Sequence, residues 1–159
     1  MRRIGVLAVA LCLLSLPVGA DAYDRLVNPF HTCSLNGPPQ YDTLQDAVNA
    51  ATPGDQIGVC PGTYDQTVVV GTSVTLTAIG SVVIGAPALS SSICFDIAAP
   101  GVTMRYFVIR NCGVRVAVEA AGALIQNNQF QSNDTGVAIT APDAIVQNNL
   151  LAASPDAPR

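Results

Sequence analysis

Apolar residues follow two kinds of pattern from residue 41 onward. Leu44, Ala47, Val48 and Ala51 recur at helical spacing behind Thr43, a suitable N-cap, so the pattern predicts a helix over 43–51. Short β-branched runs then alternate with Gly, Pro, Asn and Ser, which is typical of brief strands. These runs cover 57–60, 67–70, 74–77, 81–84 and 93–97. No run is followed by a helix long enough for a βαβ crossover.

The second half of the chain repeats with an offset of 21 residues. Ala-Leu-Ile-Gln-Asn-Asn at 123–128 recurs as Ala-Ile-Val-Gln-Asn-Asn at 144–149. Such a period predicts a solenoid, because one coil cannot bury its apolar side chains without the next. The offset aligns four apolar columns: Met104/Ile125/Val146, Ile109/Phe130/Leu151, Phe95/Val116/Val137 and Ile97/Val118/Ile139. It also aligns a polar column, Arg105/Gln126/Gln147, and predicts amide ladders at Asn127/Asn148 and Asn128/Asn149.

Residues 41–64 resemble the N-terminal cap and first coil of the pectin lyase-like right-handed parallel β-helix superfamily. A short helix precedes Pro53-Gly54-Asp55, and the coil then reaches a corner at Pro61-Gly62-Thr63-Tyr64. The repeats from 102 to 151 resemble those of the same superfamily. The resemblance implies an all-β fold, a short right-handed parallel β-helix (solenoid) with a short N-terminal capping helix. It implies no single activity, because this cap opens lyases, esterases, epimerases and proteins without known catalysis.

The amino terminus has the layout of a secretory signal peptide over residues 1–22. Arg2 and Arg3 precede an apolar run at 4–16, and Ala20-Asp21-Ala22 is a small-x-small cleavage site. We therefore expect a secreted protein, extracellular or periplasmic. The apolar run is too short to span a membrane. The remaining chain divides into an irregular segment at 23–40, a β-helix domain at 41–151 and a polar tail at 152–159.

Charge argues against a nucleic-acid partner. The 159 residues carry a formal net charge of −4. Loss of the signal peptide leaves five arginines and ten acidic residues, a net charge of about −5. A protein that binds nucleic acid needs a basic surface to neutralise phosphates.

Four cysteines remain after the signal peptide, Cys33, Cys60, Cys94 and Cys112. An even number in an exported chain favours disulfides, and three pairings are possible. Cys33–Cys60 with Cys94–Cys112 is preferred because it joins near neighbours in the order of the coils. There is no Cys-x-x-Cys and His31 is the only histidine, so no metal site is expected.

The chain allows only four or five coils and ends in a tail without an evident capping element. An uncapped solenoid exposes core side chains and strand edges. We therefore expect either end-to-end association through the solenoid ends or covering of that end by the tail.

Candidate chemistry is sparse. Lyases of this fold need clustered carboxylates for calcium and a basic proton acceptor, but the 21-residue offset stacks no carboxylate directly on another. The best cluster is diagonal, with Asp96, Arg115 and Glu119 on one outer patch, where they are also candidates for binding a sugar or an ion. Arg105 and Arg110 are further candidate catalytic residues, and Tyr106 is a candidate for stacking on a sugar. No cofactor is expected, apart from calcium if the protein is lyase-like.

The leading functional hypothesis is a secreted, non-catalytic β-helix module with a surface for polysaccharide or protein binding. The first alternative is a small polysaccharide lyase or glycoside hydrolase that uses Asp96, Arg105, Arg110, Arg115 and Glu119. The second is a structural envelope or surface protein that assembles through its open ends.

Overall fold

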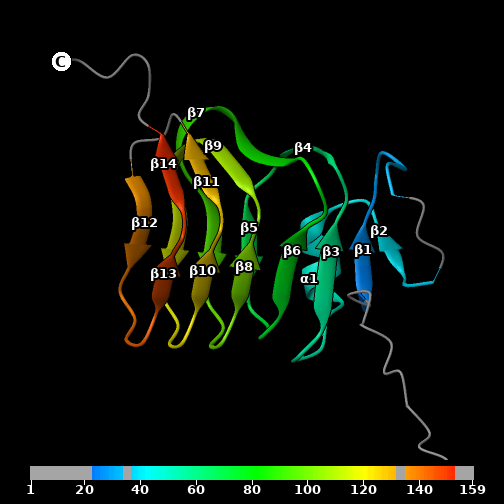
Figure 1. Cartoon of the computed structure of the whole chain (residues 1–159), viewed down its shortest axis with the longest axis horizontal. Coiled ribbons are helices and arrows are strands. Elements are labelled where there is room, and N and C mark those ends of the chain that lie inside the picture. Colours follow the sequence, from blue (N-terminus) through cyan, green and yellow to red (C-terminus); the bar gives the residue numbers. More distant parts are fainter. Residues whose placement is uncertain (1–22, 34–36, 132–134, 153–159) are drawn as a thin grey trace, which may run out of the picture.

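The short strands wind into a parallel β-solenoid of about four turns, with one short helix (Figure 1). This computed structural model describes residues 23–33, 37–131 and 135–152. The all-β prediction is confirmed. The predicted signal peptide and most of the polar tail lie outside the described residues. None of the described helices has the length and apolar character needed to cross a membrane.

One sheet forms the first face of the solenoid, and all of its strand pairs are parallel. Its seven strands follow the coil order except at the start, where β1 and β2 extend the sheet beyond β3. In spatial order they are β2 (Gln40–Tyr41), β1 (Arg25–Val27), β3 (Gln56–Val59), β6 (Thr75–Ala78), β8 (Thr103–Arg105), β10 (Leu124–Gln126) and β13 (Ile145–Gln147).

The other two faces share two long strands that turn a corner, β7 (Val82–Ile97) and β9 (Val108–Val118). Their first halves pair in a row with β4 (Gly62–Asp65), β11 (Gln129–Gln131) and β14 (Leu150–Ala152). Their second halves pair with β5 (Val68–Val70) and β12 (Thr135–Ile139). Each complete coil therefore contributes one stretch of strand to each of the three faces, and in two coils one long strand serves two faces.

The predicted apolar columns are confirmed by the register of the strands. Met104, Ile125 and Val146 are direct neighbours across β8, β10 and β13, and the other three columns pair in the same way. Column members below the last coil, such as Ile125 and Phe130, are fully buried. Stacking of like residues builds a continuous core.

The last coil, which we define as residues 135–152, leaves this core open. Val146 and Leu151 are 39% and 65% exposed, although Ile125 and Phe130 directly below them are at 0%. Ile139 is also exposed, above fully buried Val118. The last coil therefore exposes side chains at positions that are buried in the coils below it, as expected for an uncapped solenoid end.

Helix α1 spans Leu44–Asn49, inside the predicted range 43–51. Thr43 is its N-cap, and its Oγ1 accepts from the Asp46 N–H at 3.0 Å. Leu44, Ala47 and Val48 are buried. Because the first sheet continues past β3 to β1 and β2 (Figure 1), the position of α1 alone does not establish that it caps the solenoid.

One side chain of α1 is bound to the edge of a strand. The Gln45 Oε1 accepts from the Val69 N–H at 2.8 Å, and its Nε2 donates to the Val69 carbonyl at 3.1 Å. Nε2 also donates to Asn49 Oδ1 at 2.9 Å. The two backbone groups of Val69 that face away from β7 are therefore occupied.

The segment 23–40 is not wholly irregular, because Arg25–Val27 form β1. Leu26 and Val27 are fully buried, and β1 lies parallel to β3. Its three residues are too few to show an alternating pattern, so the flanking Asn and Pro turn signals dominated the sequence pattern.

Two disulfides join Cys33 to Cys60 and Cys94 to Cys112, with Cα–Cα distances of 5.7 and 5.9 Å. The preferred pairing is confirmed. The first ties the amino-terminal segment to the first coil, and the second joins β7 to β9 in adjacent coils.

A ladder of asparagine side chains follows the corner between the first two faces. The Asn128 Nδ2 donates to Asn149 Oδ1 at 3.2 Å and to the Met104 carbonyl at 3.1 Å, and its Oδ1 accepts from the Phe107 N–H. This predicted ladder is confirmed. The predicted Asn127/Asn148 ladder is wrong: no side-chain hydrogen bond joins them, and both have left-handed backbone with φ of 57° and 55°.

Candidate functional site

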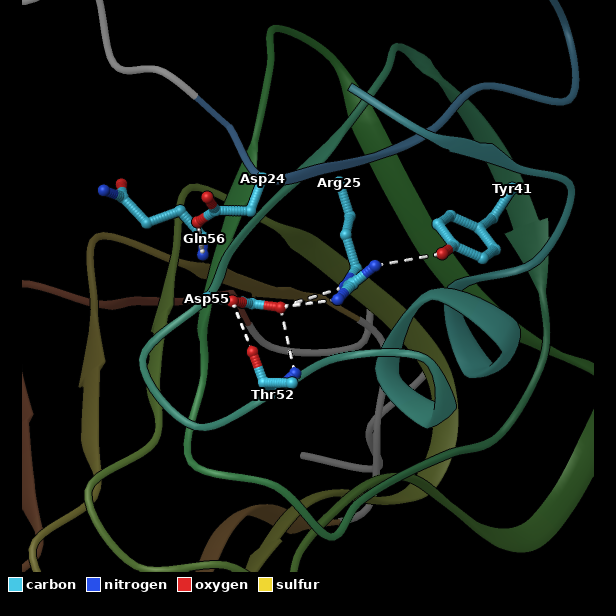
Figure 2. Close-up of polar contacts among 6 residues, drawn as sticks. All are labelled: Asp24, Arg25, Tyr41, Thr52, Asp55 and Gln56. Carbon is cyan, nitrogen blue, oxygen red and sulfur yellow. Dashed lines mark hydrogen bonds and ion pairs between the residues drawn. The ribbon is translucent and has the colours of Figure 1, made fainter. Parts of the chain in front are cut away.

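A polar cluster at the start of the solenoid is centred on Asp55, in the turn before β3 (Figure 2). The Arg25 guanidinium lies against its carboxylate, with NH2 at 2.8 Å and Nε at 3.0 Å from Oδ2. Thr52 donates from its N–H to Oδ2 and from its hydroxyl to Oδ1, both at 2.9 Å. These donors, the Thr52 N–H foremost, lower the pKa of Asp55.

The other members of this cluster are also paired. Arg25 NH1 donates to the Tyr41 hydroxyl at 3.1 Å, and Asp24 Oδ2 accepts from the Gln56 N–H at 2.8 Å (Figure 2). The cluster thereby ties β1 and β2 to the turn before β3. Because its charges are used within the chain, we assign it a structural role.

The strand register positions the backbone of the predicted diagonal patch on β7 and β9. Asp96 in β7 is the direct neighbour of Ala117 in β9, as the repeat predicts. The Glu119 N–H donates to the Ile97 carbonyl, so Glu119 lies just beyond β9, and its side chain is exposed. No hydrogen bond or ion pair joins Asp96 to Glu119 in the described structure. Arg115 belongs to β9, two residues before Ala117.

Asp96 has an unusual environment for a strand residue. It alternates with fully buried Phe95 and Ile97, and lies between Val69 and Ala117 on the outer surface. Its Oδ1 is buried and has no hydrogen-bond partner among the described residues.

Arg105 and Tyr106 are consecutive in the sequence, and their side chains contact each other. The Arg105 Cζ lies 5.6 Å from the centre of the Tyr106 ring, within the range of a cation–π interaction. Arg105 Nε donates to Thr77 Oγ1 at 2.9 Å. No carboxylate pairs with Arg105 within the described part of the chain, where Arg25–Asp55 is the sole ion pair.

Tyr106 is both exposed and held in an unfavourable backbone conformation. Its side chain is 49% exposed, and its φ is 71°. The equivalent residues of the next two coils are Asn127 and Asn148, also left-handed. Asparagine tolerates this conformation, whereas a bulky aromatic residue rarely adopts it.

Arg105 belongs to a row of polar side chains along the outer surface of the first sheet. Thr77, Arg105, Gln126 and Gln147 are successive neighbours, and Gln147 Nε2 donates to Gln126 Oε1 at 3.0 Å. We call these four residues the polar column. The repeat predicts three of them but misses Thr77, because 28 residues separate it from Arg105.

The strands of the polar column carry no acidic residue. All residues of β6, β8, β10 and β13 are described, and none is Asp or Glu. Arg110 lies on a different face, in β9 between Gly85 and Gln131, and is exposed. Arg105 therefore has no acidic neighbour within these four strands, although the chain as a whole is acidic.

A metal centre has no ligand set in the described residues: no three His, Cys, Asp or Glu side chains gather there. The lone His31 is exposed, and the nearby Cys33 is bonded to Cys60. A Cys-His catalytic pair at this position is therefore excluded.

The fold defines the chain as a parallel β-solenoid with an exposed aromatic–arginine pair on its first face. No protein-family model, curated protein or solved structure matches the chain.

Proposed function

We propose that the protein is a secreted, non-catalytic module that binds an acidic polysaccharide at Arg105 and Tyr106. The observation that carries the proposal is Tyr106, an exposed aromatic side chain in a left-handed position that asparagine fills in the next two coils. Strained positions of this kind cluster at functional sites. A residue that costs stability and leaves about half of its side chain exposed is well explained by a binding role.

The chemistry of the surroundings suits an anionic sugar. The ring of Tyr106 offers an apolar face for a pyranose, and the guanidinium of Arg105 offers paired donors for a carboxylate. Gln126 and Gln147 continue a line of amide donors and acceptors along the solenoid. Because β6, β8, β10 and β13 contain no acidic residue, no negative charge on these strands repels an anionic polymer.

Export and the finer details of the fold are part of the same proposal. Two disulfides in the described residues fit an oxidising compartment. We extend the proposal to a right-handed, pectin lyase-like β-helix whose α1 caps the first coil. The two hydrogen bonds between Gln45 and Val69 support the capping role.

Binding is tested by isothermal titration of the mature protein with polygalacturonate and with neutral dextran. We expect binding of the acidic polymer and no binding of dextran. Arg105→Gln weakens binding about tenfold or more, because a charged hydrogen bond contributes about 1.5–3 kcal/mol. Arg110→Gln is the matched control, since it removes the same charge from another face. Equal losses in both variants contradict the proposed site.

A second variant separates strain from binding. Tyr106→Asn should raise the free energy of unfolding by roughly 0.5–1 kcal/mol, because asparagine accepts the left-handed backbone, while binding is lost. Thermal and chemical unfolding give the first quantity and titration the second. Retained binding would refute a role for the ring.

Size-exclusion chromatography of the polymer after incubation with protein and calcium checks catalysis, and any shortening overturns the non-catalytic assignment.

A further inference from the structure

The last coil combines exposed core positions with unpaired strand edges. Val146, Leu151 and Ile139 continue buried columns, and Ile145 and Leu150 beside them are 55% and 58% exposed. Among the described strands, β12, β13 and β14 each have a partner on one side only. Such edges recruit further strands.

The same coil is almost free of charge. Asp143 is the one charged residue within 135–152, and it lies in the turn before β13. The apolar end is therefore not protected by the charged side chains that commonly blunt sheet edges. One coil contains 21 residues. This number is similar to the roughly 20–30 residues that each partner contributes to a standard protein–protein interface.

At the opposite end of the solenoid, two of the three strand rows differ from those of the last coil. The outward backbone groups of Val69 in β5 are bound by Gln45. The first sheet ends in β2, which has only two residues. A head-to-tail stack would require the open last coil to dock on this occupied end.

We propose that two copies of this chain associate through their last coils, as a two-fold, tail-to-tail dimer. A two-fold axis perpendicular to the solenoid reverses the strand direction, so strands meet antiparallel across the interface, each edge finding an unpaired edge. The exposed apolar residues of the two last coils then cover one another. Because the interface is its own complement, association stops at two copies.

The test is sedimentation velocity of the mature protein over a wide concentration range. We expect a monomer–dimer equilibrium and no larger species. Leu151→Lys, which places a charge at a side chain 65% exposed in the single chain, should weaken dimerisation at least about tenfold, because it buries an unpaired charge. Circular dichroism checks that the variant keeps its fold.

Val69→Lys is the matched control, since Val69 is an exposed apolar residue, 46% accessible, next to the occupied end. It should leave the dimer unchanged. A strict monomer at all concentrations overturns the proposal and points to residues 153–159 or a continuing chain as the cover. A series of larger species, or equal weakening by both variants, overturns it in favour of head-to-tail stacking. Arg105→Gln should keep the dimer. A failure of the dimer proposal can therefore be distinguished from a failure of the proposed polysaccharide binding.

Discussion

Two left-handed backbone positions recur from coil to coil, and the residues that occupy them differ in the free energy that this conformation costs. Gly101, Gly122 and Asp143 occupy the first position, with φ of 67°, 70° and 58°. Tyr106 and its two asparagine successors occupy the second. Glycine and asparagine make these corners at little cost, whereas tyrosine does not. This contrast within one column is the reason why we single out Tyr106 for the proposed binding role.

Tyr64 shows the effect of burial on a single side chain. Its hydroxyl donates to the Cys60 carbonyl at 2.7 Å, and its ring meets the edge of Phe30. Burial raises the pKa of Tyr64 to about 12, against about 10 in the unfolded chain. The native state therefore holds this proton more tightly. The resulting stability is fully present below about pH 10 and is lost as the pH rises through 12.

We expect Tyr64→Phe to lower the free energy of unfolding at pH 7 by about 1 kcal/mol, because one hydrogen bond is lost and the Cys60 carbonyl is left without it. The variant should lose less additional stability than the wild type between about pH 10 and 12. Denaturant unfolding at several pH values measures both effects. Tyr106→Phe is the control, because its ring is 49% exposed; parallel alkaline profiles for wild type and Tyr64→Phe would rule out this account.

At the scale of the element, the corners hold the coils in register. The Asn128 side chain is 1% exposed and bonds to Phe107, Met104 and Asn149. Asn149 makes similar bonds one coil further on, with its Nδ2 donating to the Ile125 carbonyl at 2.8 Å. Each asparagine thus satisfies backbone groups of the coil beneath it.

Asn128→Ala should reduce the free energy of unfolding by about 3 kcal/mol, because buried donors and acceptors lose their partners. Asn149→Ala is the matched change in the last coil, where the side chain is only partly buried, and it should cost about 1 kcal/mol. Chemical denaturation of the two variants gives the comparison. If both substitutions lower the free energy of unfolding by the same amount, burial does not determine how much an asparagine of the ladder contributes to stability.

The sequence predicted the later coils better than the earlier ones, for a physical reason. From Phe95 onward every coil has the same length, so a fixed offset aligns its columns. Register shifts between Gly85 and Ile93 lengthen the preceding coil, and the offset then fails. Thr77 was missed for this reason. The contact of Gln45 with Val69 left no signal in the pattern, because it depends on how the chain returns between α1 and β5.

For the molecule as a whole, the disulfides limit the freedom of the unfolded chain. The Cys94–Cys112 bond closes 18 residues and the Cys33–Cys60 bond closes 27. Chain entropy predicts about 3 kcal/mol from each. The double variants Cys94→Ala/Cys112→Ala and Cys33→Ala/Cys60→Ala should each lose about this much stability in urea unfolding. A loss well below about 1 kcal/mol in either would mean that the corresponding crosslink does not restrict the unfolded state.

The occupied edge at Val69 also has an evolutionary consequence. Duplication of one 21-residue unit, such as 123–143, would insert a coil whose columns continue those above and below it. A unit added ahead of α1 would have to displace Gln45 from the strand that it binds. Genes for longer versions of this solenoid should therefore grow by tandem duplication downstream of the first coil, and keep a single, unrepeated beginning.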